Sequence, residues 1–390
     1  MKKFIILFLF AVSCIYAQVD FQGTLSSSFY SFKPSSGENQ LDQYHGFNFK
    51  LNPQDNSDLY FKGNVKAIYD SGPQKWREKV HSAYVSWNTP LAGSRVQIGR
   101  QFLYAGVVNG TLDAVSVFLK PVDKLDVRLF GGVVAPYERK LEVTQWDDGN
   151  ALGGYGSYRV NSMFKLNASY FQKQRNKDLY WQQMGTTLSG RISNVAYLLK
   201  YDHNLLAEDY QTILVYASYD YKNWSFTGEA SSQKPKIYED SFFSYFKLRE
   251  HNQFRLATSY RIQSYEIGLQ VINTLFKESE SNQQLIATLG NTWGVAGVVY
   301  QTGFGGENIG LYADINYLLM SDLRFTLHSS HYKYERESVQ LDEEATSFSA
   351  GFRYTPQKSL GVGIQVQQSM NSLYESDFRG LLNLSYSFNY

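Results

Sequence analysis

The chain has 390 residues, of which 43% are hydrophobic, 16% aromatic and 19% charged, and its formal net charge is +1. A chain this close to neutral lacks the excess of positive charge that is typical of nucleic-acid-binding proteins, and we expect no nucleic-acid partner. The mean hydropathy of −0.36 is that of a water-soluble protein. Alternating lipid-facing and lumen-facing residues give a similar average in a transmembrane β-barrel, so the composition does not exclude that class.

The N-terminal residues 1–17 have the pattern of a secretory signal peptide. Two lysines precede an apolar core at residues 4–16, which is too short for a membrane-spanning helix. We expect cleavage after Ala17 and a mature barrel at residues 18–390. Cys14 is the only cysteine, and its lipidation is the alternative. After cleavage at Ala17 the mature chain has no thiol for a disulfide, a nucleophile or a metal site.

The first half of the mature chain alternates apolar and polar residues, which is the period of a β-strand. The clearest stretch is 59–69, where the apolar face contains Leu59, Phe61 and Val65. A cluster of polar residues at 52–58 predicts a turn before it. Further strands are predicted at 21–29, 47–51, 83–87, 95–98, 115–119 and 125–129.

The second half repeats the same alternation and adds tight turns. Residues 222–223 separate two such stretches, and residues 263–264 separate the next two. No segment after the signal peptide shows a 3.6-residue period over helical length. Strands are predicted at 164–170, 213–221, 224–230, 254–262, 265–271, 311–317, 323–327, 348–354 and 360–366.

The last fourteen residues, 377–390, carry the strongest strand signal. Apolar residues or glycine occupy every second position from Phe378 to Tyr390. A strand of a soluble protein has about five or six residues, whereas a tilted strand that crosses a bilayer needs about 9–11. This end resembles the C-terminal strand of Gram-negative outer-membrane β-barrels, although their usual last residue is Phe. The resemblance implies recognition by the barrel-assembly machinery through the strand that ends at Tyr390.

These patterns predict an all-β fold, a transmembrane antiparallel up-and-down β-barrel of about 18–22 strands in the cell outer membrane. The count is open because 240–262 and 283–302 can each form one strand or two. Connections alternate between short turns, expected on the periplasmic side, and longer polar loops on the extracellular side. The longer loops are predicted at 34–42, 70–78, 137–150, 234–241 and 335–344. A two-sheet sandwich is the alternative, but it needs fewer and shorter strands.

Basic residues outnumber acidic ones by roughly thirteen to five on the polar faces, which line the lumen of a barrel. The basic residues are Lys50, Lys62, Lys66, Arg95, Lys120, Arg128, Lys165, Lys200, Arg255, Arg261, Arg324, Arg353 and Arg379. The acidic residues are Asp126, Asp202, Glu229, Glu266 and Asp314. A basic lumen favours anions. The alternative is that each cation pairs with a neighbouring acid, and a register error of one residue would exchange the faces.

The segment RVQIGRQFLYAGVVNGTLDAV, at 95–115, resembles a local pattern of porin-like families that include alginate-export proteins and phosphate-selective porins. The shared features are a strand ending in Gly99-Arg100-Gln101, a glycine-containing loop, and Asp113 ahead of the next strand. The resemblance covers about twenty residues and implies the porin-like class. By this analogy Arg100 is a candidate pore-lining residue. The alternative is that this arginine holds the loop at the strand end.

No arrangement of residues indicates an enzyme. His328 and His331 lie three apart in a predicted strand, so they face opposite sides and do not converge on a metal or a nucleophile. The glycine-rich stretch 303–306 leads into another strand and not into a helix, which argues against phosphate binding. We expect no catalytic residue, no cofactor and no metal.

The sequence therefore predicts a passive porin-like channel for small hydrophilic solutes, with a preference for anions. The alternatives are a transporter of an acidic oligosaccharide and a non-conducting barrel that serves as a surface receptor or structural protein. The loops at 137–150 and 335–344 are too short to fill such a barrel, which favours an open pore. Outer-membrane lipid is the expected surrounding, and homo-oligomerisation is left open.

Overall fold

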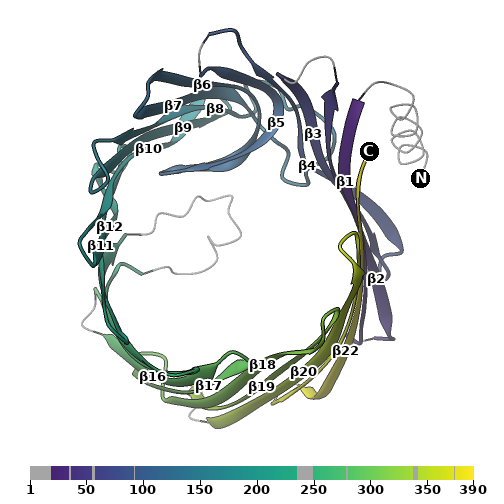
Figure 1. Ribbon diagram of the computed structural model, residues 1–390, viewed down its shortest axis with the longest axis vertical. Coiled ribbons are helices and arrows are strands. Elements are labelled where there is room, and N and C mark those ends of the chain that lie inside the picture. Colours follow the sequence, from purple (N-terminus) through teal and green to yellow (C-terminus); the bar gives the residue numbers. More distant parts are fainter. Residues whose placement is uncertain are drawn as a thin grey trace.

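The computed structural model is a closed β-barrel of 22 strands (Figure 1). It describes residues 19–34, 37–54, 58–91, 93–234, 249–277, 280–336, 341–372 and 374–390. The predicted signal peptide, Cys14 and most of the loop predicted at 234–241 lie outside these residues. Within the described ranges, no helix has the length and apolar character needed to cross a membrane.

The first eleven strands are β1 (Val19–Phe32), β2 (Gln40–Pro53), β3 (Leu59–Asp70), β4 (Lys75–Asn88), β5 (Arg95–Ala105), β6 (Val108–Val122), β7 (Leu125–Val134), β8 (Asn150–Arg159), β9 (Lys165–Arg175), β10 (Asp178–Ile192) and β11 (Val195–Asn204). The other strands are β12 (Asp209–Tyr221), β13 (Trp224–Gln233), β14 (His251–Ile262), β15 (Tyr265–Phe276), β16 (Ser281–Asn291), β17 (Gly294–Gly303), β18 (Asn308–Met320), β19 (Leu323–Arg336), β20 (Leu341–Gln357), β21 (Leu360–Asn371) and β22 (Tyr374–Asn389).

Each strand pairs antiparallel with the next one in the chain, and the last strand closes the ring on the first. The closing register joins β1 to β22 from Gln22 opposite Asn389 to Ser31 opposite Gly380. The predicted all-β up-and-down barrel is therefore confirmed, with the strand number at the upper end of the expected range. The stretch 283–302, which was open to two interpretations, forms the two strands β16 and β17.

The connections differ between the two ends of the barrel. At the end where β1 begins and β22 ends, many turns occupy two residues, as at 222–223 and 263–264. The longest connections, 135–149 and 234–250, lie at the opposite end. The predicted difference between short and long connections holds for the four connections just named. The tight turns at 106–107 and 176–177, however, lie at the same end as the longest connections.

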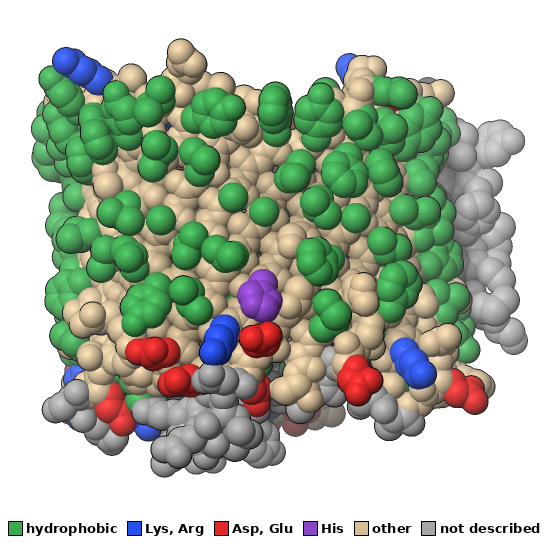
Figure 2. All heavy atoms as spheres, turned by 90° about the horizontal axis from the view of Figure 1, so that it is seen from below, with side chains coloured by type: hydrophobic (Ala, Val, Ile, Leu, Met, Phe, Trp, Pro, Cys, Tyr) green, Lys and Arg blue, Asp and Glu red, His purple; other side chains and the backbone are tan. Residues whose placement is uncertain are grey.

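On the side shown in Figure 2, many apolar side chains cover the outer surface, and charged side chains gather near its lower edge. On β14, Phe254 and Leu256 are exposed and flank Arg255, which is half-buried on the other side of the sheet. Where a strand lies in the wall, its exposed apolar residues thus mark the outer face, and the side chains between them face the lumen. Aromatic rings cover the closing seam, where the Phe21 and Phe388 centroids lie 5.0 Å apart.

The hairpin of β5 and β6 leaves the wall and folds into the barrel (Figure 1). Strand β4 pairs with β5 only from Ala83 to Asn88, and beyond that level the hairpin turns inward. The bend begins at Gly99, whose φ of +125° is rarely accessible to residues with a side chain. The tip, Gly106–Val107, reaches the inner faces of β9 and β10, where the Val107 amide donates to Ser169 Oγ at 3.1 Å.

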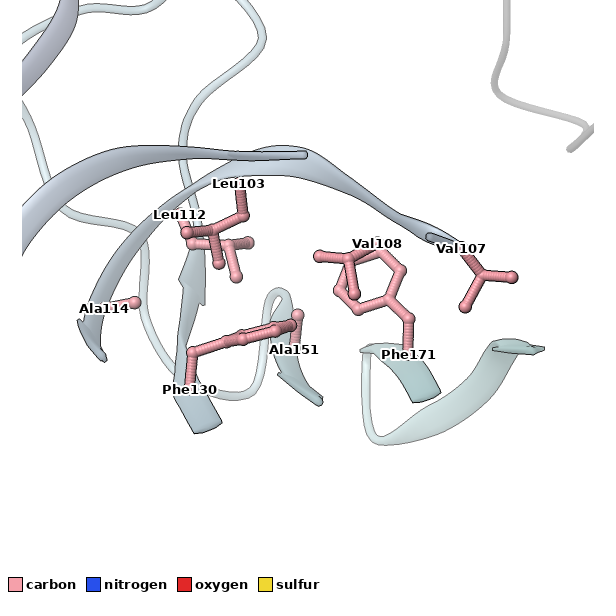
Figure 3. Packing of buried hydrophobic residues seen from close by; sticks show 8 residues of the cluster. All are labelled: Leu103, Val107, Val108, Leu112, Ala114, Phe130, Ala151 and Phe171. Atoms are coloured by element: carbon pink, nitrogen blue, oxygen red, sulfur yellow. The ribbon is translucent and has the colours of Figure 1, made fainter. Parts of the chain in front are cut away.

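A hydrophobic core forms between this hairpin and the inner wall (Figure 3). Leu103 and Leu112 from the hairpin are 1% and 0% exposed, and they face Phe130 and Phe171 from β7 and β9. Full burial of each such side chain contributes about 1.5–3 kcal/mol. The core also contains Val107, Val108, Ala114 and Ala151. The hairpin is therefore held in the lumen by the same force that folds soluble proteins.

Substitution of Leu112 by Ala tests this core. Because Leu112 is fully buried, Leu112→Ala should lower the free energy of unfolding by about 2–5 kcal/mol. Urea-induced unfolding in lipid vesicles, followed by tryptophan fluorescence, measures the change. Leu141→Ala is the control, because Leu141 is 72% exposed in the 135–149 loop and should change stability by less than about 0.5 kcal/mol. Equal losses in both variants would contradict an internal core.

Candidate functional site

The candidate site is the inner face of β2 to β7, where several basic side chains lie next to one another and form no ion pair among the described residues. Lys50 lies directly opposite Lys62 in the register of β2 and β3. Lys66 lies directly opposite Lys79 in the register of β3 and β4. Side chains directly opposite one another in an antiparallel pair have Cβ atoms about 4.5–5.5 Å apart. Two like charges at about 4 Å repel by about 1 kcal/mol even in water, so this lysine ladder costs stability.

No ion pair in the described part of the chain includes any of these four lysines. Lys50 Nζ lies 4.7 Å from the Tyr60 ring centroid. Lys62 and Lys66 are exposed, and they alternate with the outward residues Phe61 and Val65. The ladder therefore presents uncompensated positive charge to the lumen.

Sequence analysis missed Lys79, because a β-bulge changes the face on which it lies. The register between β3 and β4 shifts at Asn64 and Val65, so that Ser82 and Val80 pair in succession and His81 is the extra residue. Without this bulge, the alternation set by Ala83 would place Lys79 on the lipid side. A single inserted residue leaves no clear signal in the hydrophobic pattern.

Other predicted lumen residues pair with acids, as the alternative interpretation expected. Arg255 lies 2.9 Å from Glu229, and Arg261 lies 3.1 Å from Glu266. Lys200 and Arg379 likewise pair with carboxylates, those of Asp202 and Asp377. The structure thus separates the predicted cations into a neutralised group and an uncompensated group.

Two further predicted residues, Arg324 and Arg353, form a second pair of like charges. They lie opposite each other in the register of β19 and β20. Arg353 alternates with the exposed residues Phe352 and Tyr354, which places it on the lumen side. Arg324 Nη1 donates to Asn316 Oδ1 at 3.2 Å, so its partner is neutral.

Arg95 and Arg128 meet around one aromatic ring, and Lys120 lies nearby, next to the turns that connect β4 to β5 and β6 to β7. The guanidinium carbons of Arg95 and Arg128 lie 4.1 Å and 4.5 Å from the Phe118 ring centroid. Lys120 lines a cavity of about 430 Å³ together with Arg95 and Phe118. Arg128 also donates to Gln101 Oε1 at 3.2 Å, at the base of the inward hairpin.

Arg100 is a buried anchor and does not line the pore. Its side chain is 4% exposed and binds Asp113 through two parallel contacts of 2.8 Å. It also donates to the backbone carbonyls of Lys140 at 2.6 Å and Glu142 at 2.7 Å. The Gly99-Arg100 pair followed by Asp113 is thus explained by the bend of the hairpin and by the buried ion pair that holds it. Arg100 holds the 135–149 loop, which was the alternative to a pore-lining role.

The 135–149 loop takes the place of β5 beside the part of β4 that contains Val80. The Val80 amide donates to the Arg139 carbonyl at 2.7 Å, and the Ala135 amide donates to the Thr111 carbonyl of the hairpin at 3.0 Å. Burial lowers the pKa of Arg139, and the positive charge of Arg100 lowers it further. Backbone groups that the departing hairpin would leave without partners are therefore satisfied by the loop.

The lumen-facing side of the hairpin carries two exposed aromatic rings. Phe102 and Tyr104 are 58% and 73% exposed, on the opposite side of β5 from the buried Leu103. Their ring centroids lie 6.2 Å apart with an interplanar angle of 7°. Both residues alternate as lipid-facing residues do, so the sequence gives no signal that the hairpin turns them toward the lumen.

The described residues contain no group of three or more His, Cys, Asp or Glu that could hold a metal ion. His328 Nδ1 contacts Asp314 at 2.6 Å, whereas His331 Nδ1 contacts Thr346 Oγ1 at 2.8 Å. These partners lie on opposite faces of the sheet, as the spacing of the two histidines predicts.

No family model matches the chain, and no curated protein matches its sequence. The P pilus usher (PapC) translocation pore matches with a TM-score of 0.50 and 8% identity, over 94% of this chain and 99% of that one. Acinetobacter baumannii OccAB1 matches with a TM-score of 0.45 and 10% identity, over 95% and 96% of the two chains. Pseudomonas aeruginosa OccK2 (OpdF) matches with a TM-score of 0.46 and 12% identity, over 95% and 98%.

Of these structures, the PapC usher is a translocation pore. Identities this low show a common fold and no more. The chain thus has a closed 22-strand β-barrel fold, and its function has to be inferred from its own residues.

Removing the charge of Arg100 should release the 135–149 loop. Arg100→Gln leaves Asp113 without its buried partner, and such a loss costs about 3–5 kcal/mol. Trypsin cleavage after the exposed Lys140 should therefore become faster, as followed by mass spectrometry of the folded protein. Asp70→Asn is the control, since it removes a more exposed pair with Arg77 and should leave the cleavage rate unchanged. An unchanged rate in Arg100→Gln would show that the loop does not depend on this anchor.

Proposed function

We propose that the protein is an outer-membrane channel through which small hydrophilic solutes diffuse passively, with a preference for anions. The observation that carries this proposal is the lysine ladder, Lys50 opposite Lys62 and Lys66 opposite Lys79. Neighbouring like charges are unfavourable for folding. The four lysines would repay this loss of stability in function if they attract anionic solutes to the lumen wall.

The mechanism is electrostatic. Surfaces of one sign of charge in a channel with low-dielectric walls raise the local concentration of counter-ions. The four lysines lie together on three neighbouring strands, whereas Arg255 and Arg261 elsewhere are neutralised by acids. An anion that follows the inner face of β2 to β4 therefore meets unbalanced positive charge, and a cation is repelled there.

The inward hairpin sets the cross-section that remains for solutes. It packs along the inner faces of β7 to β10 and reaches Ser169. This inserted element was not expected, since the open-pore prediction considered only the loops at 137–150 and 335–344. The hairpin lends support to a second candidate, a non-conducting barrel that serves as a receptor, and a conductance measurement decides between the two.

Export and insertion complete the proposal. A signal peptide at residues 1–17 would deliver the chain to the periplasm, and the strand that ends at Tyr390 would be recognised by the barrel-assembly machinery. In the structure, Tyr390 closes the seam through two backbone hydrogen bonds of 2.9 Å with Phe21. Tyr390 is thus part of the barrel wall.

Charge reversal in the ladder tests the anion preference. Lys62→Glu combined with Lys66→Glu should lower the chloride-to-potassium permeability ratio on the order of tenfold, because the local counter-ion concentration changes sign. The reversal potential of the reconstituted protein under a potassium chloride gradient measures this ratio.

The matched control is Lys222→Glu combined with Lys358→Glu, which makes the same charge change in exposed turns. It should leave the permeability ratio near that of the unmodified protein. An open pore without anion preference in the unmodified protein would reject the selectivity, and folded protein without conductance would favour the receptor.

A further inference from the structure

We propose that Arg95, Lys120 and Arg128 form a discrete binding site for a doubly charged oxyanion, beside the turns that connect β4 to β5 and β6 to β7. This inference deepens the proposed function, because it assigns one anchoring point within the channel and a ligand class to it. The lysine ladder acts on all anions by its charge, whereas this site would hold one anion at a time.

Strand register brings the site together. Arg95 lies opposite Phe118, and Phe118 lies opposite Arg128, so the three side chains form a row across β5, β6 and β7. Both guanidinium groups contact the same ring, at 4.1 Å and 4.5 Å from its centroid. A ring contact of this kind holds a guanidinium plane in place while its edge stays available for hydrogen bonds.

The charges of the site do not balance. Arg95 and Lys120 line the cavity of about 430 Å³, and the carboxylate of Asp126 is the acidic group on its lining. None of the ion pairs found in the described ranges includes Arg95, Lys120, Arg128 or Asp126. Three cations and one carboxylate leave two positive charges uncompensated, which is the charge that a dianion brings.

Polar atoms of the site also lack partners. The Nε atoms of Arg95 and Arg128 are buried and make no hydrogen bond in the structure. Arg128 uses Nη2 for Gln101 and Ser116, at 3.2 Å and 3.4 Å, and Gln101 is in turn fixed by Ser116 and the Ala114 carbonyl. Arg128 is thus positioned by the base of the inward hairpin, while part of its hydrogen-bonding capacity is unused.

The chemistry of these groups selects the ligand class. A guanidinium offers a planar fork of donors that matches the paired oxygens of carboxylates and phosphates, and charge-assisted bonds of this kind are about twice as strong as neutral ones. The cavity lies within the range of about 300–1,000 Å³ typical of small-molecule sites. Dicarboxylates and phosphate share the required chemistry, and both serve as probes.

The test is block of chloride current through the reconstituted full chain by succinate or by inorganic phosphate. Each dianion is added at constant ionic strength to the side on which the short turns lie. The current should fall with dianion concentration to a half-block value. Arg95→Gln and Arg128→Gln should each raise that value about tenfold, which is the loss expected for one charge-assisted hydrogen bond.

Two further variants separate binding from a purely structural effect. Asp126→Asn removes the acidic group and should lower the half-block concentration, which a loss of structure would not do. Arg95→Lys keeps the charge but loses the planar fork, so its half-block concentration should lie between those of the unmodified protein and Arg95→Gln. Arg191→Gln, an exposed arginine next to the turn that ends β10, should leave block unchanged.

Block of the current by either dianion supports the site. Block by only one of them shows whether the site prefers a dicarboxylate or phosphate. Absence of block by either, or equal block in all variants, overturns it. An anion-preferring channel without block would retain the proposed function and reject only this site. If the protein does not conduct, calorimetric titration of the folded full chain with the same dianions replaces the current, and binding that is lost in Arg95→Gln would support the site without the channel.

Discussion

The need to pair every backbone polar group against lipid governs this structure. A sheet can cross a membrane only if it has no free edge, because an unpaired amide or carbonyl in hydrocarbon costs several kcal/mol. The pairing of β22 with β1 removes the edge, and the Tyr390 and Phe21 backbones complete it with two bonds of 2.9 Å. Apolar side chains outside and polar side chains inside then follow from the two faces of a strand.

The inward hairpin interrupts this backbone pairing at one place in the wall, and other groups of the chain replace the lost hydrogen bonds. Where β5 leaves the wall, β4 loses a neighbour, and the 135–149 loop supplies the Arg139 carbonyl to the Val80 amide. Arg100 fastens that loop through carbonyls and its buried pair with Asp113. The wall is therefore less regular here than elsewhere, and the hydrophobic core beneath the hairpin provides the stabilisation.

The barrel was predictable because a wall strand alternates apolar residues, such as Phe61 and Val65, with polar ones. The inward hairpin and the β-bulge were not, because they depend on contacts between residues far apart in the sequence. Residues 102–105 are all apolar and so depart from the alternation of a wall strand, but their destination on β7 to β9 is not encoded locally. One signal was present: Leu103, Leu112 and Phe130 occupy lumen positions where polar residues are expected. The lysines at 50, 62 and 66 were found from alternation alone. Lys79 was not, because the β-bulge at His81 changes its face.

Cysteine accessibility along β5 tests most directly whether the hairpin narrows a water-filled lumen. Cys14 is the only cysteine of the chain, so a single new thiol is readily followed. Tyr104→Cys, at a position 73% exposed, should react rapidly with a charged methanethiosulfonate and lower the single-channel current. Leu103→Cys, at a position 1% exposed, should not react. Equal reactivity of both thiols, or modification of Tyr104→Cys without any change in current, would contradict the account.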